Sequence, residues 1–480
     1  MYSKSLTLWM IVSIIIAFYF GLTSYDLLNN NEGLYAQIPF EMLQNKSFVI
    51  PTLNTVPYIE KPPMVYWLIA GSYALLGKSV LAARLVPATF GMLTALGLLF
   101  LYARLGLRRQ GIMAAILLSS SLGFAVFSRM VFFDVVLTAF FTFALLSFYL
   151  WFQTTNRRWL LLFYAFLGGA VLTKGLLPLV LAGIICLWFV AFYYRTWQKI
   201  FQIFNPLGIA IFMALTVPWH WMAHLQLAEF SWFYFVNEHF FRFLDLREPR
   251  DYYHGPWYYY LIRLPGYVLP WTLLLPLWGR QGEGVDERIP TLKTFAWIWF
   301  LITLAFFTIS RAKANYYMVL GLPPLIILLI EYGAQRVHFE KLLKLGTIFS
   351  VTALITATFL VPKYTSQFSA KSAVDFLQNN QIQGSLYYYK QYERLSSFLF
   401  YWNQPIPIVD SVSSDLDFGS KLSQGKGMFL SWEDMKTKPV PQLFIVHPKD
   451  ASEFENKAGM RALKLYADEG VGAYKVSNHE

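Results

Sequence analysis

Apolar runs long enough to cross a lipid bilayer recur through the first three quarters of this 480-residue chain. A spanning helix needs roughly 20 mostly apolar residues, and we expect about eleven spans of this kind. They lie near residues 6–23, 81–103, 110–127, 132–153, 159–173, 177–194, 205–223, 264–279, 292–309, 315–333 and 343–361. Only 14% of the residues are charged, against roughly 25% in soluble domains. The sequence therefore predicts a polytopic α-helical membrane protein.

The formal charge of +11 is explained by membrane topology rather than by nucleic-acid binding. The basic residues do not form a cluster within a nucleic-acid-binding motif, so we expect no nucleic-acid partner. The short loops on the side of Lys4 hold thirteen Lys and Arg residues, and the short loops on the opposite side hold four. The positive-inside rule then places the N-terminus in the cytoplasm and the polar residues after 361 outside the membrane.

Two long loops, about 24–80 and 224–263, fall on the external side of this topology. The first contains an apolar stretch, 62–76, that is short and begins with two prolines. Counting it as a span would invert every later loop, so we predict an in-plane or re-entrant helix. The second loop is rich in aromatic residues, which favour the membrane interface. It is either an interfacial belt or a groove for a lipid-linked substrate.

The residues after 361 change character and predict a small extracytoplasmic α/β domain. We therefore divide the chain into a transmembrane catalytic domain, 1–361, and a soluble domain, 362–480. Short β-type runs occur at 385–389, 406–409, 428–431, 443–446 and 472–476. The Asp415-Leu416-Asp417 triplet is interpreted as a solvated turn. A phosphate-cradling glycine-rich loop is absent from the sequence, and we expect no nucleotide cofactor.

Polar residues that are unusual beside a membrane fall on the external face of the predicted topology. Ionisable groups at membrane depth cost free energy unless they are paired or lie in a wet cavity, so they mark candidate functional sites. The residues are Asp26, Asn31, Glu32, Glu60, Lys61, Arg129, Asp134, Lys174, Asn237, Glu238, His239, Arg242, Arg311, Lys313, Tyr316 and Tyr317. We expect the acidic and basic members of this set to share one water-accessible pocket at the extracytoplasmic rim.

The residue types in this set suit the transfer of a sugar from a sugar phosphate. Such a reaction needs a carboxylate to deprotonate the acceptor, and Glu32 and Asp134 are the candidate bases. It also needs positive charge, or a metal ion, to stabilise the departing phosphate. Lys61, Arg242 and Lys313 are the candidate cations, with a tyrosine hydroxyl as a further donor.

A divalent metal ion is a candidate cofactor, with Glu60 and His239 as its two possible ligands. The only cysteine, Cys186, lies in an apolar run and is expected to be a small buried hydrophobic residue.

Short motifs over residues 1 to about 330 resemble those of the bacterial family-39-type glycosyltransferases. That group includes the lipid A aminoarabinose transferase and relatives of the protein O-mannosyltransferases. The motifs are Asn31-Glu32-Gly33-Leu34-Tyr35-Ala36, 54–58, Glu60-Lys61-Pro62-Pro63 with Tyr66-Trp67, 129–134, Leu172-Thr173-Lys174-Gly175, Pro218-Trp219, Asn237-Glu238-His239 with Arg242-Phe243, Pro270-Trp271, and 313–317 with Pro323.

This resemblance implies a GT-C fold, a polyprenyl-phosphate sugar donor, and a lipid A, glycolipid or protein acceptor on the periplasmic side. It implies that the first-loop acidic motif supplies the base and that Lys61, Arg242 and Tyr317 contact the lipid phosphate. It also makes Glu60 and His239 candidate metal ligands. The other site residues that we expect are Asn31, Tyr35, Tyr58, Arg129 and Lys174.

The first loop departs from the aminoarabinose transferases, which typically carry Asp-Glu-x-Arg there. This chain has Asn31, Glu32, Gly33 and Leu34 at the matching positions. An amide cannot act as a general base near neutral pH, so the base is Glu32 or Asp134. The departure leaves the identity of the sugar open.

Two other classes of function are weighed against the enzyme. A membrane transporter or lipid flippase would use similar buried charges, but it usually shows internal repeats or helices broken deep in the membrane, and we find no internal repeat in the sequence. A scaffold protein gives no reason for Glu32, Lys61 and Asp134 to share one face of the membrane.

Overall fold

The computed structural model describes residues 2–193, 197–250, 254–279 and 290–477. The chain divides into two compact units. The helical unit comprises Met1–Gly21 and Arg84–Thr356, and the α/β unit comprises Leu22–Ala83 and Ala357–Glu480. Packing thus groups the first long loop with the end of the chain. The division into functional domains 1–361 and 362–480 stays a prediction.

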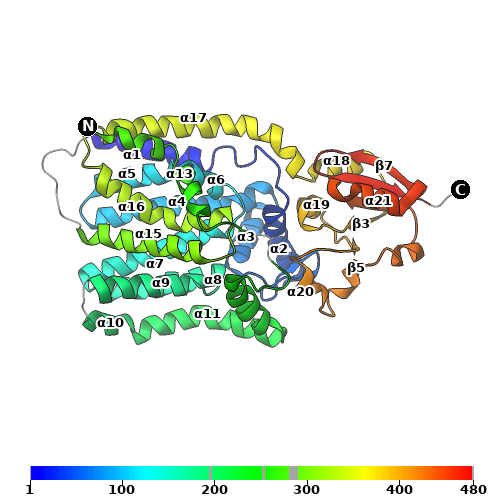
Figure 1. The fold of residues 1–480 in the computed structure, drawn as a ribbon, viewed down its shortest axis with the longest axis horizontal. Coiled ribbons are helices and arrows are strands. Elements are labelled where there is room, and N and C mark those ends of the chain that lie inside the picture. The colour runs from blue at the N-terminus through cyan, green and yellow to red at the C-terminus, as the bar shows by residue number, and fades with distance from the viewer. Residues whose placement is uncertain (1, 194–196, 251–253, 280–289, 478–480) are drawn as a thin grey trace. The chain divides into compact units, whose positions relative to one another are not determined.

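The helical unit consists of apolar helices that run alongside one another (Figure 1). Helix α7 packs on α8, α8 on α9 and α11, and α15 on α16. The helices are α1 (Tyr2–Phe18), α4 (Val80–Arg104), α5 (Arg108–Ser119), α6 (Leu122–Ser128), α7 (Phe133–Thr154), α8 (Arg157–Lys174), α9 (Leu177–Trp188), α10 (Trp197–Ile203), α11 (Pro206–Gln226), α15 (Pro290–Ile309), α16 (Leu322–Gly333) and α17 (Phe339–Thr365).

Among the described residues, 6 helices are long and apolar enough to cross a membrane, or 7 if the bent pair α5 and α6 forms one span. The chain is therefore a multi-pass membrane protein, as predicted. The expected spans near 6–23 and 177–194 form helices shorter than a bilayer needs. The expected end at residue 194 lies outside the described residues, and the count of about eleven stays a prediction.

The predicted span at 264–279 is not one helix. It is divided among α13 (Tyr259–Tyr267), α14 (Trp271–Leu274) and the 3-10 helix η3 (Leu275–Trp278). Pro270 immediately precedes α14 and Pro276 lies in the first turn of η3, and proline has no backbone N–H to continue a helical ladder. Composition alone predicted one continuous span, because the residues of this segment are mostly apolar.

The second long loop begins with a ten-residue π-helix, η2 (Trp232–Phe241), which continues into the short helix α12 (Arg242–Leu244). π-helical segments are rare and occur frequently at functional sites. A 3-10 helix, η4 (Asn315–Gly321), precedes α16.

The first-loop part of the α/β unit holds α2 (Asn31–Asn45), a hairpin of β1 (Thr52–Leu53) and β2 (Val56–Pro57), and α3 (Met64–Leu76). A helix within the predicted stretch 62–76 is thus confirmed as α3, and its in-plane or re-entrant placement stays a prediction. The buried Glu41 carboxylate orders the hairpin turn by accepting hydrogen bonds from Thr52 Oγ1 at 2.8 Å, Asn54 N at 2.8 Å and Thr55 N at 3.0 Å. Burial raises the pKa of Glu41.

The tail forms a six-stranded sheet in the order β5-β4-β3-β6-β8-β7. Strands β3 to β6 are mutually parallel, and β8 and β7 add antiparallel strands beside β6. The strands are β3 (Ser385–Tyr389), β4 (Ile408–Val409), β5 (Phe429–Leu430), β6 (Gln442–Val446), β7 (Ala462–Ala467) and β8 (Gly472–Val476). Its helices are α18 (Lys371–Asn379), α19 (Ser396–Trp402), α20 (Asp417–Ser420) and α21 (Ala451–Ala458).

The five predicted strands are confirmed, and the exposed edge strand β7 was missed. The sheet core contains Tyr389, Phe444, Phe454 and Tyr474. The first loop is hydrogen-bonded to the tail within this unit. Asn54 Nδ2 donates to the Ile406 carbonyl oxygen at 2.7 Å, and Ile406 N donates to Asn54 Oδ1 at 2.9 Å.

His447 gives the α/β unit a predictable response to acid. Its Nδ1 accepts a hydrogen bond from Lys449 N at 3.2 Å, and burial, aided by Arg394 and Lys449, lowers the pKa of His447 from 6.5 to about 4. The unfolded chain therefore takes up this proton first as the pH falls. We expect the unfolding temperature of the purified protein to fall between pH 6.5 and pH 4 as this contribution is lost.

The control is His447→Asn, which keeps a hydrogen-bond acceptor but does not titrate. This variant should lose less stability over the same pH interval. Equal losses in both proteins would assign the acid response to other groups.

Candidate active site

An ion pair joins two predicted site residues in the helical unit. Lys174 Nζ lies 2.5 Å from Asp134 Oδ1, and both side chains are largely buried. Asp134 is in the first turn of α7 and Lys174 is the last residue of α8. The loop between α7 and α8 is short, so the start of α7 and the end of α8 lie at the same end of the helix pair. Each charge also has the sign that its helix terminus favours.

Two tyrosines complete this cluster. Lys174 Nζ lies 4.1 Å from the ring centre of Tyr317 and 5.6 Å from that of Tyr316, within range of cation–π attraction. Phe132 stacks on Tyr316 with 4.7 Å between ring centres. The ion pair occupies one carboxylate oxygen of Asp134, which gives this residue a role that needs no proton transfer. Glu32 is therefore the better candidate for the base.

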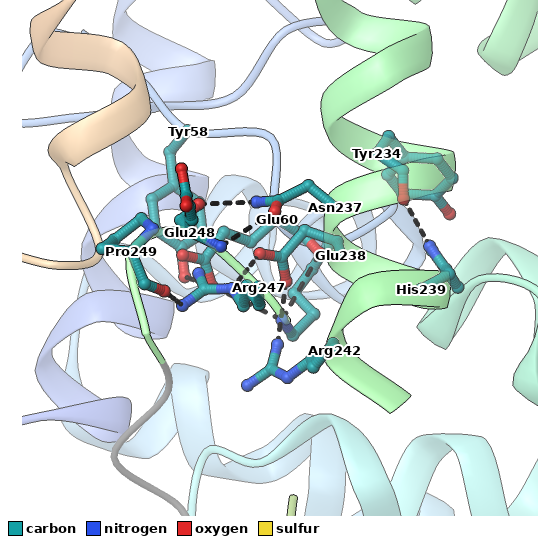
Figure 2. Close-up of polar contacts among 11 residues, drawn as sticks. Tyr58, Glu60, Tyr234, Asn237, Glu238, His239, Arg242, Arg247, Glu248 and Pro249 are labelled. Carbon is teal, nitrogen blue, oxygen red and sulfur yellow. Dashed lines mark hydrogen bonds and ion pairs between the residues drawn. The ribbon is translucent and has the colours of Figure 1, made fainter. Parts of the chain in front are cut away.

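His239 lies on η2, and its contact with the Tyr234 carbonyl oxygen fixes which ring nitrogen carries the hydrogen (Figure 2). Its Nδ1 lies 2.5 Å from the Tyr234 carbonyl oxygen. A carbonyl can only accept, so Nδ1 carries the hydrogen and Nε2 holds the lone pair of the neutral ring. A Cβ atom at Gly175 would lie 1.8 Å from His239 Nε2. Gly175 has φ +71°, so glycine permits both its backbone conformation and the close approach of this ring.

Arg129 and Lys313 make contacts with the backbone. Arg129 donates a hydrogen bond to the Phe20 carbonyl oxygen. Lys313 Nζ donates to three carbonyl oxygens at the end of α15, at distances from 2.5 to 3.1 Å. A cation at a helix C-terminus satisfies carbonyl groups that lack a helical partner. These contacts give both residues a structural role, and their assignment to the site stays a prediction.

Glu32 and Asn31 lie in the first turn of α2 in the α/β unit. Glu32 is 1% exposed, and its Oε2 accepts a hydrogen bond from Leu28 N at 3.1 Å. An acidic residue in a first turn is favoured by the helix dipole. The fold thus holds this carboxylate in a buried place at the N-terminus of a helix.

The hairpin presents a second group of predicted residues in the α/β unit. Tyr58 donates a hydrogen bond to Glu60 Oε2 at 3.3 Å, and Lys61 Nζ lies 3.6 Å from the same oxygen. The rings of Tyr35 and Tyr66 are 6.4 Å apart. Burial raises the pKa of Tyr58 well above its ordinary value, and the negative charge of Glu60 adds to this effect. Tyr58 therefore remains a neutral hydrogen-bond donor.

The tail contributes Glu393 and Asp415 to the surroundings of this group. Glu393 is buried and accepts hydrogen bonds from Ser413 Oγ at 2.5 Å and Asp415 N at 3.0 Å. Burial raises the pKa of Glu393. The negative charge of Asp415 contributes to the raised pKa of Tyr58, after burial and Glu60. The prediction of a solvated turn at 415–417 is wrong, because Leu416 is fully buried and Asp415 and Asp417 are partly buried.

Sequence reasoning did not single out Glu41 or Arg247. Glu41 orders the hairpin before Tyr58, and Arg247 pairs with Glu238, which also pairs with Arg242 at 2.8 Å. Glu41 gave little signal because it lies inside a mixed apolar and polar helix. Arg247 belongs to the charged run 245–250, which is typical of a solvated loop.

The proposed metal ligands are not part of a larger ligand cluster. Within the described residues, no group of three or more His, Cys, Asp or Glu side chains is arranged to hold a metal ion. Catalytic zinc sites usually supply three protein ligands. His239 has a tautomer suited to a metal ligand, and the assignment of Glu60 and His239 as metal ligands stays a prediction.

Three comparisons relate the chain to known proteins. Residues 60–222 match the family model described as dolichyl-phosphate-mannose-protein mannosyltransferase. The undecaprenyl phosphate-alpha-4-amino-4-deoxy-L-arabinose arabinosyl transferase 2 of Pseudomonas fluorescens (strain Pf0-1) is 30% identical over 342 residues, which are 69% of this chain and 60% of that protein. The corresponding transferase of Serratia proteamaculans (strain 568) is 30% identical over 361 residues, 72% of this chain and 63% of that protein.

The fold has a solved counterpart. The crystal structure of ArnT from Cupriavidus metallidurans bound to undecaprenyl phosphate has a TM-score of 0.81 to this chain, at 20% identity. The match covers 99% of this chain and 98% of that one. It confirms the predicted GT-C fold. In sequence, the chain spans about 60% of the length of the first curated relative.

Gly175→Ala should destabilise the helical unit, because the added Cβ collides with the His239 ring and the backbone has a positive φ. We expect a loss of about 1–3 kcal/mol, measured as a lower unfolding temperature of the purified protein. Gly183→Ala is the matched control, since a Cβ at that helical position meets nothing within 4 Å.

The same substitution in a His239→Ala background should cost less, because the colliding ring is gone. An equal cost in both backgrounds would contradict the packing of His239 on Gly175.

Proposed function

We propose that the chain is a bacterial family-39-type glycosyltransferase, which moves a sugar from a polyprenyl-phosphate donor to a lipid A, glycolipid or protein acceptor. The observation that carries the proposal is the 30% identity to arabinosyl transferases whose names specify an undecaprenyl-phosphate sugar. The buried carboxylates, cations and tyrosines described above have the chemistry that this reaction needs.

We infer the orientation from loop charge. An excess of Lys and Arg in the short loops on the side of Lys4 favours a cytoplasmic N-terminus. The residues after 361 then lie outside the membrane, and the reaction takes place at the periplasmic face of a bacterial inner membrane.

In the proposed mechanism, Glu32 accepts the proton of the acceptor hydroxyl as that oxygen attacks the anomeric carbon. The bond from the anomeric carbon to the phosphate oxygen breaks, and negative charge grows on the phosphate. Lys61 and Arg242 stabilise this charge, and the Tyr317 hydroxyl donates a further hydrogen bond. Asp134 keeps Lys174 in place beside Tyr317.

The proposed chemistry is cation-assisted. A divalent ion held by Glu60 and His239 would supply further positive charge beside the phosphate. The transporter or flippase alternative is not pursued, because the family and the fold are those of transferases.

The activity is tested by mass spectrometry of envelope glycolipids and glycoproteins from cells with and without the protein. We expect one sugar increment to disappear when the protein is absent and to return with the wild-type chain. Identical spectra in both strains, grown under conditions where the protein is made, would contradict the proposed activity.

Glu32→Gln should lower the transfer rate by about 10³-fold, because the proton acceptor is lost while the side-chain size is kept. Binding of undecaprenyl phosphate, followed by native mass spectrometry, should change little. The control is Glu433→Gln, which changes an exposed carboxylate of the same unit and should leave the transfer rate unchanged. Normal turnover by Glu32→Gln would transfer the role of base to another residue.

Lys61→Ala should raise the KM for the donor by about tenfold or more, because a charge-assisted hydrogen bond to the phosphate is removed. The measurement is initial transfer rate against donor concentration. Lys421→Ala is the control, since Lys421 is 70% exposed and pairs with Asp417 at the surface. An unchanged KM would exclude Lys61 from the phosphate site.

A further inference from the structure

Glu238 is a buried carboxylate on η2 that takes no part in the proposed mechanism. It is 5% exposed. Taking a carboxylate out of water costs several kcal/mol unless charged partners and hydrogen bonds compensate. A carboxylate buried in this way therefore depends on its partners.

Two arginines share this carboxylate (Figure 2). Arg242 NH1 lies 2.8 Å from Glu238 Oε2, and Arg247 Nε donates to Glu238 Oε1. Each carboxylate oxygen thus takes one guanidinium group. The three side chains carry a net charge of one positive unit, and without Glu238 two like charges would face each other.

Arg247 is the fixed member of this triad. It is 5% exposed, and its NH1 donates to the Pro249 carbonyl oxygen at 3.0 Å. Asn237, the neighbour of Glu238, ties the same segment to η2. Its Nδ2 donates to the Glu248 carbonyl oxygen at 2.7 Å, and its Oδ1 accepts from Glu248 N at 3.0 Å. The segment around Arg247 is therefore held by both backbone and side chain.

Arg242 is the most exposed of the three side chains. Its side chain is 18% exposed, against 4% for Arg247 and 1% for Glu238. It begins α12, one helical turn after Glu238. An arginine has five N–H donors in a planar fork, which is more than the contact between Arg242 NH1 and Glu238 requires.

We propose that Glu238 is a positioning residue, which transmits the fixed place of Arg247 to Arg242 and so orients the Arg242 guanidinium toward the donor phosphate. The inference rests on the proposed function, because Arg242 was assigned there to the phosphate. Glu238 itself does not touch the substrate. Orientation by a buried acidic partner reduces the rotamer freedom that Arg242 would lose on binding.

The informative variant is Glu238→Gln. Glutamine has nearly the same size but only one carbonyl oxygen, and its amide nitrogen donates. The two arginines contact different oxygens of Glu238, and in glutamine one of these positions becomes an N–H donor, so one contact is lost in this geometry. Glu238→Asp keeps both oxygens on a shorter stem and provides a second variant that should retain the fold while displacing Arg242.

The experiment measures binding of undecaprenyl phosphate to the purified full chain by native mass spectrometry. Arg242→Ala should weaken binding by about tenfold, and Glu238→Gln by a similar factor. The double variant should bind no more weakly than Arg242→Ala alone, because Glu238 acts through Arg242. Glu340→Gln is the matched control, since it removes another Arg–Glu contact of the same unit, with Arg109.

A kinetic readout separates positioning from general structural support. Both Glu238 variants should raise the donor KM more than they lower kcat, and Glu238→Asp should lie between wild type and Glu238→Gln. Losses that add in the double variant, or a fall in kcat alone, would overturn the positioning role. If the wild-type chain binds no undecaprenyl phosphate, the proposed function fails as well, whereas strong wild-type binding that Glu238→Gln leaves intact overturns only this inference.

Discussion

The cost of removing ionised groups from water governs the arrangement of the predicted site residues. Each buried carboxylate has partners suited to its surroundings: a lysine for Asp134, two arginines for Glu238, and backbone N–H groups for Glu41. Unpaired charges in these places would be expelled or neutralised. The partners therefore decide where these side chains lie, and the apolar helices supply the low-dielectric setting that makes the pairing strong.

Much of the fold was predictable because its signals are local. The apolar runs gave the long helices, the alternating tail gave five strands, and the proline-led stretch gave α3. Two predictions of secondary structure failed, one at the span 264–279 and one at strand β7. Pro270 and Pro276 divide the apolar stretch 264–279. Strand β7 was missed because an edge strand with exposed positions carries a weak apolar pattern.

The site was less predictable, since its residues are recognised by contacts that join distant parts of the chain. Sequence motifs named Asp134 and Lys174, but only the pairing of α7 with α8 shows that they form one ion pair. They also named His239 and Gly175 without showing that the ring and the glycine touch. Arg247 lies in a charged run whose composition resembles a solvated loop, so burial alone distinguishes it.

The hydrogen bonds between Asn54 and Ile406 have a consequence for biosynthesis. Their two partners are separated by most of the polypeptide, and a ribosome makes them at widely different times. The loop that carries Glu32 and Lys61 cannot make these hydrogen bonds until residue 406 has been synthesised. A nascent chain halted before Ile406 would thus lack the backbone partner that both hydrogen bonds of the Asn54 side chain require.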